Sequence, residues 1–148
     1  MIDGIKFTLN PDAVRSSDVL VFHRISEGRD EAKYKGFTIK LYQDKCYVAG
    51  SIHKYKNNGE HNADDFLLSE FIQTLNDMAV TLNFNPETVP FYSLEFGVNV
   101  ELPFDVHTFI DSVVYCNNGI LISDRKGIKF QFSDYEIKIY LKNINKTC

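Results

Sequence analysis

The stretch YKGFTIKLYQDKCYVAGSIHKY, residues 34–55, has the clearest alternation of apolar and polar residues in the sequence. Its first ten residues place apolar Phe37, Ile39 and Leu41 at every second position, which is typical of a strand with one buried face. A polar turn follows at residues 43–45, and residues 46–55 resume the strand-like composition. The stretch therefore predicts a β-hairpin with strands at residues 34–43 and 46–55.

Two helices and further strands are predicted around this hairpin. Apolar residues recur at three- and four-residue spacing from Leu68 to Leu82, which predicts a helix over residues 64–83 with Asn62 as its cap. A shorter helix is expected at residues 105–115. The other expected strands lie at residues 5–9, 19–25, 92–100, 128–132 and 135–141. This order predicts an α+β fold, with a mainly antiparallel sheet and two helices on one face, in a single domain over residues 1–148.

The longer helix should supply the contacts between the layers. We expect its apolar stripe to pack on the sheet that contains Phe96 and Val98. The residues expected to make this contact are Leu68, Phe71, Leu75 and Leu82.

Composition restricts the class of protein. The formal net charge of −4 argues against a protein that coats itself with nucleic acid, although a local basic patch could still bind it. No run of about 18 apolar residues and no signal peptide are visible, so we expect no membrane contact and a cytoplasmic location in a bacterial host cell. Cys46, Cys116 and Cys148 are expected to be reduced, the first two as packing groups.

The loop after the hairpin is the stretch of the sequence richest in hydrogen-bond donors. Asn57, Asn58 and Gly59 suit positive backbone φ, and nearby lysines could hold phosphate together with backbone N–H groups. The alternative is an ordinary solvated connection to the helix. The candidate residues for binding nucleic acid or a partner are His53, Lys54, Tyr55, Lys56, Asn58 and His61.

Two strands carry the remaining candidates. Lys138, Tyr140 and Lys142 share one face of the last strand and could contact a nucleic-acid backbone and stack on bases, or simply face water. Glu95 stands in an apolar-alternating strand and is a candidate metal ligand, the alternative being a solvent-facing charge.

No enzyme signature is visible. The spacing of His53 and His61, with Asp64 or Asp65 nearby, matches no standard metal site, so a structural role is favoured for them. The sequence has no P-loop, dinucleotide fingerprint or nucleophile elbow. We therefore assign no catalytic residue and no cofactor.

Three segments together resemble the replication proteins of phages and plasmids of the filamentous-phage nicking type, particularly those of Bacteroidota mobile elements. The segments are YVAGSIHKYKNNGEHN (residues 47–62), LEFGVNVELPF (residues 94–104) and FSDYEIKIYLK (residues 132–142). The opening MIDGIKF and the helix between the first two segments also fit, so the resemblance covers nearly the whole chain.

The resemblance implies nicking of one DNA strand by a tyrosine, with Mg²⁺ or Mn²⁺ held by acidic residues. Glu95 matches the glutamate of the family's EFG-like strand, whereas Leu141 stands where an acid is expected. The chain also ends at Cys148, before the second half of such an initiator, and no catalytic tyrosine can be assigned. We therefore expect no DNA cleavage by the isolated chain.

Three functional hypotheses follow. The first is a truncated, non-catalytic relative of a replication initiator that binds DNA, RNA or a nucleoprotein. The second is a phage-encoded inhibitor of a host defence nuclease, such as a CRISPR effector with its guide RNA, which the acidic charge would suit. The third is a metal-dependent nickase that needs a partner chain.

Overall fold

The computed structural model describes residues 2–98, 100–124 and 127–141. These residues form two compact units, residues 1–98 and residues 99–148, and each is described by itself. The prediction of a single domain over residues 1–148 stays a prediction.

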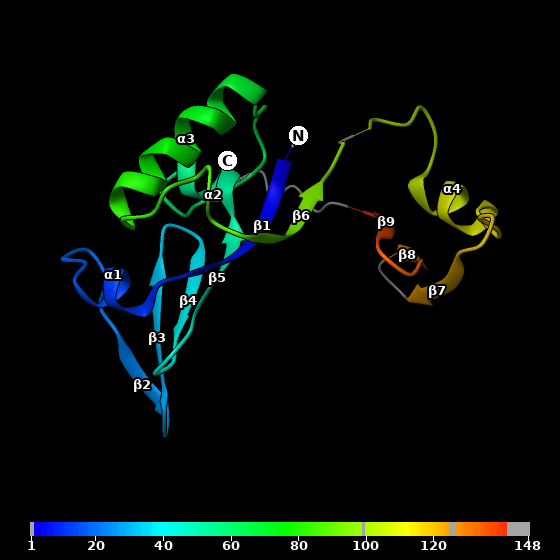
Figure 1. Cartoon of the computed structure of the whole chain (residues 1–148). Coiled ribbons are helices and arrows are strands. Elements are labelled where there is room, and N and C mark those ends of the chain that lie inside the picture. The colour runs from blue at the N-terminus through cyan, green and yellow to red at the C-terminus, as the bar shows by residue number, and fades with distance from the viewer. Residues whose placement is uncertain (1, 99, 125–126, 142–148) are drawn as a thin grey trace. The chain divides into compact units, whose positions relative to one another are not determined.

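The first unit contains a six-stranded sheet in which every neighbouring pair of strands is antiparallel (Figure 1). The strand order is β2-β3-β4-β5-β1-β6. The strands are β1 (Ile2–Leu9), β2 (His23–Ser26), β3 (Arg29–Tyr34), β4 (Phe37–Leu41), β5 (Cys46–Ser51) and β6 (Phe91–Phe96). The predicted hairpin is β4–β5, and the α+β class with a mainly antiparallel sheet is confirmed.

Three helices accompany this sheet: α1 (Pro11–Arg15), α2 (Ile52–Lys56) and α3 (Leu68–Thr81). Alternate residues of the central strands, among them Phe7, Ile39 and Val48, are fully buried with Met78 and Leu82 of the α3 segment. Cys46 belongs to the same core, as predicted, and burial raises the pKa of its thiol to about 11. One face of the sheet is therefore the core face.

The predicted second hairpin strand is wrong in its last part. Residues 46–51 form β5, but residues 52–56 form α2. The Oγ atom of Ser51 accepts a hydrogen bond from the Lys54 N–H and caps this helix. Ile52 and Tyr55, three residues apart, then both reach the core, which an extended strand would not allow.

The predicted long helix is shorter than expected. It begins after Leu67, whose N–H donates to Glu70, and Asn62 donates to Asp3 instead of capping it. Phe71 and Leu75 pack against the core and Leu82 is buried, as predicted, but Leu68 is exposed. Leu68 is the first residue of α3, so the buried side of the helix begins one turn later, at Phe71, and continues through Met78 and Ala79.

The strand predicted at residues 92–100 is β6, which ends at Phe96. The long helix packs on the sheet that contains Phe96, as predicted, but Phe96 itself is 73% exposed, and Val98, which lies outside the sheet, is 82% exposed. Their position explains this, because β6 is the edge strand and Val98 follows its end.

The second unit pairs a helix with its own sheet. It contains α4 (Val106–Ser112), the shorter predicted helix, and the antiparallel strands β7 (Ile120–Asp124), β8 (Gly127–Gln131) and β9 (Glu136–Tyr140). Ile110 of α4 packs with Ile128 and Phe130 of β8. The two predicted helices therefore lie against different sheets.

None of the helices in the described parts of the chain is long and apolar enough to cross a membrane.

Candidate functional site

The predicted donor-rich loop is organised around one carboxylate, that of Asp64. Its Oδ1 atom lies 2.6 Å from Nε2 of buried His53 and accepts a hydrogen bond of 2.7 Å from the Asn57 amide. His61 Nδ1 lies 3.5 Å from the same oxygen, and the Lys56 ammonium lies 3.5 Å from Oδ2. The loop is thus a polar network that ties α2 to the segment before α3.

This network fixes the charge state of Asp64. Partial burial acts to raise its pKa, but hydrogen bonds from Asn57 and His53 outweigh this and lower the pKa from 3.8 to about 2. The His53 ring also stacks on Phe66, with ring centroids 4.7 Å apart, which holds the imidazole in place. Asp64 is therefore ionised across the physiological range.

A pH-dependent contribution to stability follows. Because the folded-state pKa of Asp64 is depressed, its stabilisation is present above about pH 4 and is lost as the pH falls toward 2. We expect chemical denaturation of the Asp64→Asn variant to show a stability deficit relative to the parent that shrinks over this window. Asp65→Asn is the matched control, because Asp65 makes no hydrogen bond or ion pair with the described residues. A deficit that stays constant from pH 5 to about pH 2 would contradict this role.

Three of the predicted loop residues are engaged inside the fold. His53 is fully buried, and Lys56 pairs with Glu70 at 2.7 Å as well as with Asp64. Tyr55 is buried, and its hydroxyl donates to Asp77 at 2.9 Å and lies 3.2 Å from the Thr81 hydroxyl. The prediction that these side chains present themselves to a partner conflicts with this burial and pairing. His61, by contrast, is exposed.

Lys54 and Asn58 are more open. Asn58 and Gly59 have positive φ values of 53° and 93°, as predicted, whereas Asn57 ends α2 with φ −93°. Lys54 is half-buried, makes no ion pair with the described residues, and lies beside Gly36 in the β3–β4 turn. Lys35 of that turn lies 4.9 Å from the centroid of the Tyr55 ring. Lys35 and Lys54 therefore form a small basic surface beside this turn.

The candidates on the last strand belong to the second unit. Lys138 pairs with Glu136 at 2.6 Å, and Lys129 of the adjacent strand pairs with the same glutamate at 3.2 Å. Tyr140 is exposed, and Lys142 lies outside the described residues. The glutamate therefore neutralises much of the charge that was expected to contact phosphate.

Glu95 is exposed on β6, with its carboxylate beside the backbone of Gly4 on β1. Among the described residues, no three His, Cys, Asp or Glu side chains are grouped so that they could hold a metal ion. The position corresponds to a charge on the solvent side of the sheet.

The face of the six-stranded sheet opposite the core carries a group of lysines that were not among the predicted binding residues. Lys6 of β1, Lys33 of β3 and Lys40 of β4 alternate with core residues and are all exposed. None of them makes an ion pair with any described residue. We call this surface the open face.

Register places the open-face residues in two rows across the strands. Lys33 lies opposite Thr38, Thr38 opposite Ala49, and Ala49 opposite Lys6. The neighbouring row contains Glu31, Lys40, Tyr47 and Thr8. The first row thus has two lysines with small side chains between them, and the second places Tyr47 beside Lys40.

Tyr42 supports Tyr47. Their ring centroids lie 5.9 Å apart with an interplanar angle of 88°, an edge-to-face pair. Both rings are half-buried, so part of each is accessible to solvent. The signal for this surface was present in the sequence, because Thr38, Lys40 and Tyr42 are the polar half of the alternation that identified β4. It becomes a site only when the register adds Lys6 and Lys33.

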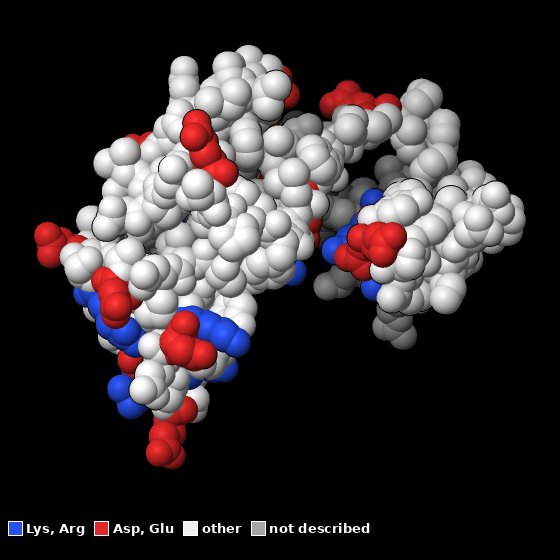
Figure 2. All heavy atoms as spheres, viewed as in Figure 1, with Lys and Arg blue, Asp and Glu red and all other residues white. Residues whose placement is uncertain are grey.

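Charge over the first unit is otherwise mixed. In the view of Figure 2, Lys and Arg side chains gather around β2 and β3 and are interspersed with Asp and Glu. Arg24 pairs with Asp30 there. The open face itself also carries Glu31 and Glu95. Attraction of a polyanion therefore depends on the unpaired lysines and not on a broad positive field.

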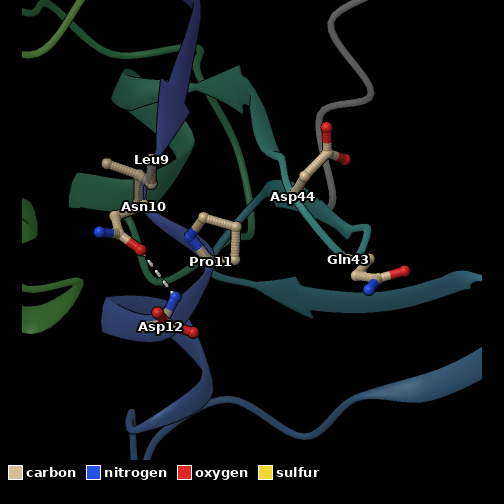
Figure 3. Close-up of a pocket in the computed structure, with 6 residues that line it drawn as sticks. All are labelled: Leu9, Asn10, Pro11, Asp12, Gln43 and Asp44. Atoms are coloured by element: carbon tan, nitrogen blue, oxygen red, sulfur yellow. Dashed lines mark hydrogen bonds between the residues drawn. The ribbon is translucent and has the colours of Figure 1, made fainter.

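A surface depression lies where β1 leads into α1, next to the β4–β5 turn (Figure 3). Its charged lining residues are Asp12 and Asp44, and Asn10 accepts a hydrogen bond of 2.9 Å from the Asp12 N–H as the cap of α1. This acidic lining does not suit an anionic ligand.

Comparison of the chain with protein-family models, curated proteins and solved structures finds no match.

Proposed function

We propose that this chain is a nucleic-acid-binding protein of a phage or mobile element and that it acts without cleaving its ligand. The observation that carries the proposal is the open face, where Lys40 lies opposite Tyr47 and Lys6 and Lys33 lie in the neighbouring row, and none of the three lysines makes an ion pair with a described residue. Ammonium groups that pair with none of the described residues are available to replace the counterions of a phosphate backbone.

Lysines that are already paired with a glutamate are less suited to bind phosphate. Lys56 and Lys129 each lie within 3.2 Å of a glutamate oxygen, so binding phosphate there requires breaking an existing ion pair. The sequence resemblance to replication initiators supports the mobile-element part of the proposal, and the departure at Leu141 supports the absence of cleavage.

Salt dependence tests the proposal. We expect the chain to bind a labelled oligonucleotide with a slope of log Kobs against log[salt] of about −2 to −3, because three lysines contribute roughly 0.7 to 0.9 each. Fluorescence anisotropy between low and physiological salt measures the slope. Absence of binding even at low salt would refute the proposal, and strand cleavage with Mg²⁺ would instead support a nickase.

A second candidate function is docking on a protein, such as the host nuclease–RNA complex of an anti-CRISPR-like inhibitor. The observation that favours it is the exposure of Tyr92, Leu94 and Phe96 on the edge strand β6. Aromatic anchors of this kind carry much of the affinity in protein interfaces. A stable complex with a purified nuclease–guide RNA assembly that is lost on Tyr92→Ala, without affinity for free nucleic acid, would select this function.

A further inference from the structure

We infer that the open face binds a single strand of nucleic acid, with a base stacked on Tyr47 and the phosphates along the row from Lys33 to Lys6. This inference rests on the proposed function and adds the class of ligand. It follows from the order of the side chains across the four central strands of the sheet.

The first step is the space above the row. Thr38 and Ala49 stand between Lys33 and Lys6 and are half-buried, so small side chains form the floor between the two lysines. Lys33 and Lys6 are three strands apart, a Cα separation of roughly 14 Å. The row therefore provides a shallow track with a cation at each end.

The second step is the aromatic platform beside the track. Tyr47 lies directly across from Lys40, and the edge-to-face contact with Tyr42 fixes the orientation of the Tyr47 ring. An aromatic ring held in this way offers a stacking surface that any base can use, because every base has a π-face. Its neighbour Lys40 adds a third cation next to the platform.

The third step is the choice between a single strand and a duplex. Bases in a duplex are stacked on one another and paired, so Tyr47 cannot reach a base face without disrupting the helix. The lysines alone would not discriminate, because both ligands carry phosphates. The combination of a track with a platform therefore points to an unpaired strand.

The test compares labelled oligomers of about twelve nucleotides, dT and rU, with a duplex of the same length, since single-strand sites span about 4–16 nucleotides. Tyr47→Ala should weaken binding of the single strands by about 5- to 150-fold while leaving the salt slope unchanged. Tyr47→Phe keeps the ring and should bind within about twofold of the parent. Tyr115→Ala, at an exposed tyrosine that follows α4, is the matched control and should bind as the parent does.

The outcomes separate this inference from the proposed function. If lysine substitutions weaken binding but Tyr47→Ala does not, or if the duplex binds as tightly as the single strands, nucleic-acid binding stands and the single-strand inference fails. If no oligomer binds, both fail. Should Tyr47→Ala not fold, photocrosslinking of a 5-iodouracil strand to the parent protein decides: an adduct on Tyr47 supports the inference, and an adduct confined to other residues overturns it. If one of the dT and rU strands binds more tightly than the other, the inference holds and the tighter strand identifies the preferred sugar.

Discussion

Replacing Phe7 by Ala is expected to lower the free energy of unfolding by about 3–5 kcal/mol. Phe7 lies on β1 between β5 and β6 and is completely buried. Its ring centroid lies 5.2 Å from that of Phe84 and 5.3 Å from that of Phe91. The substitution therefore leaves a cavity where three aromatic rings meet, and the rigid strands on both sides limit how far the site can collapse.

The matched control is Phe96→Ala, on the edge strand of the same sheet. Phe96 is 73% exposed, so its loss should change the unfolding free energy by no more than about 0.5 kcal/mol. Urea denaturation followed by circular dichroism measures both. Equal effects of the two substitutions would show that Phe7 is not part of the buried core.

Residues with strong periodicity were predicted well from the sequence. Alternation identified β4 and the start of β5, and the apolar stripe identified α3, because both patterns arise from one buried face. Residues 29–34 were missed as a strand although they form β3. Only Ala32 of that strand is buried, so its apolar signal is weak, and its position depends on pairing with β4.

Local signals failed where a tertiary contact decided the outcome. Ile52–Tyr55 looked like a continuing strand, but a serine cap and the core contacts of Ile52 and Tyr55 favour a helical turn. Asn62 had the right residue type for a helix cap, yet its amide donates to Asp3, which lies far away in the chain. Neither contact can be inferred from residue spacing.

The candidate site shows the same limit. The density of hydrogen-bond donors identified the loop at residues 53–61 as polar. It did not predict that His53, Asn57 and Lys56 would all contact Asp64, whose pKa is depressed. Whether a lysine is paired or unpaired depends on which carboxylates the fold brings near it. The open face is a property of strand register, because Lys6 and Lys33 are far apart in sequence and are aligned only through β4 and β5.

The pairing of lysines leads to the most direct test of the proposed function. The double variant Lys6→Gln/Lys40→Gln should reduce affinity for a single-stranded oligonucleotide by about tenfold or more at physiological salt and lower the salt slope by about 1.4. Both effects arise because two ammonium groups that release counterions from the ligand are removed while the backbone of the sheet is unchanged.

The control variant carries the same change in charge. Lys56→Gln/Lys129→Gln also removes two positive charges from a chain of net charge −4, but these lysines are already paired with Glu70 and Glu136. If the open face is the binding surface, the control keeps most of the parent's affinity and slope. If affinity depends only on net charge, the two variants lose it equally, because long-range repulsion does not distinguish where a charge was removed. A greater loss in the control would place the phosphate contacts away from the open face. Titration with NaCl of all three proteins, each bound to the same oligonucleotide, separates these cases.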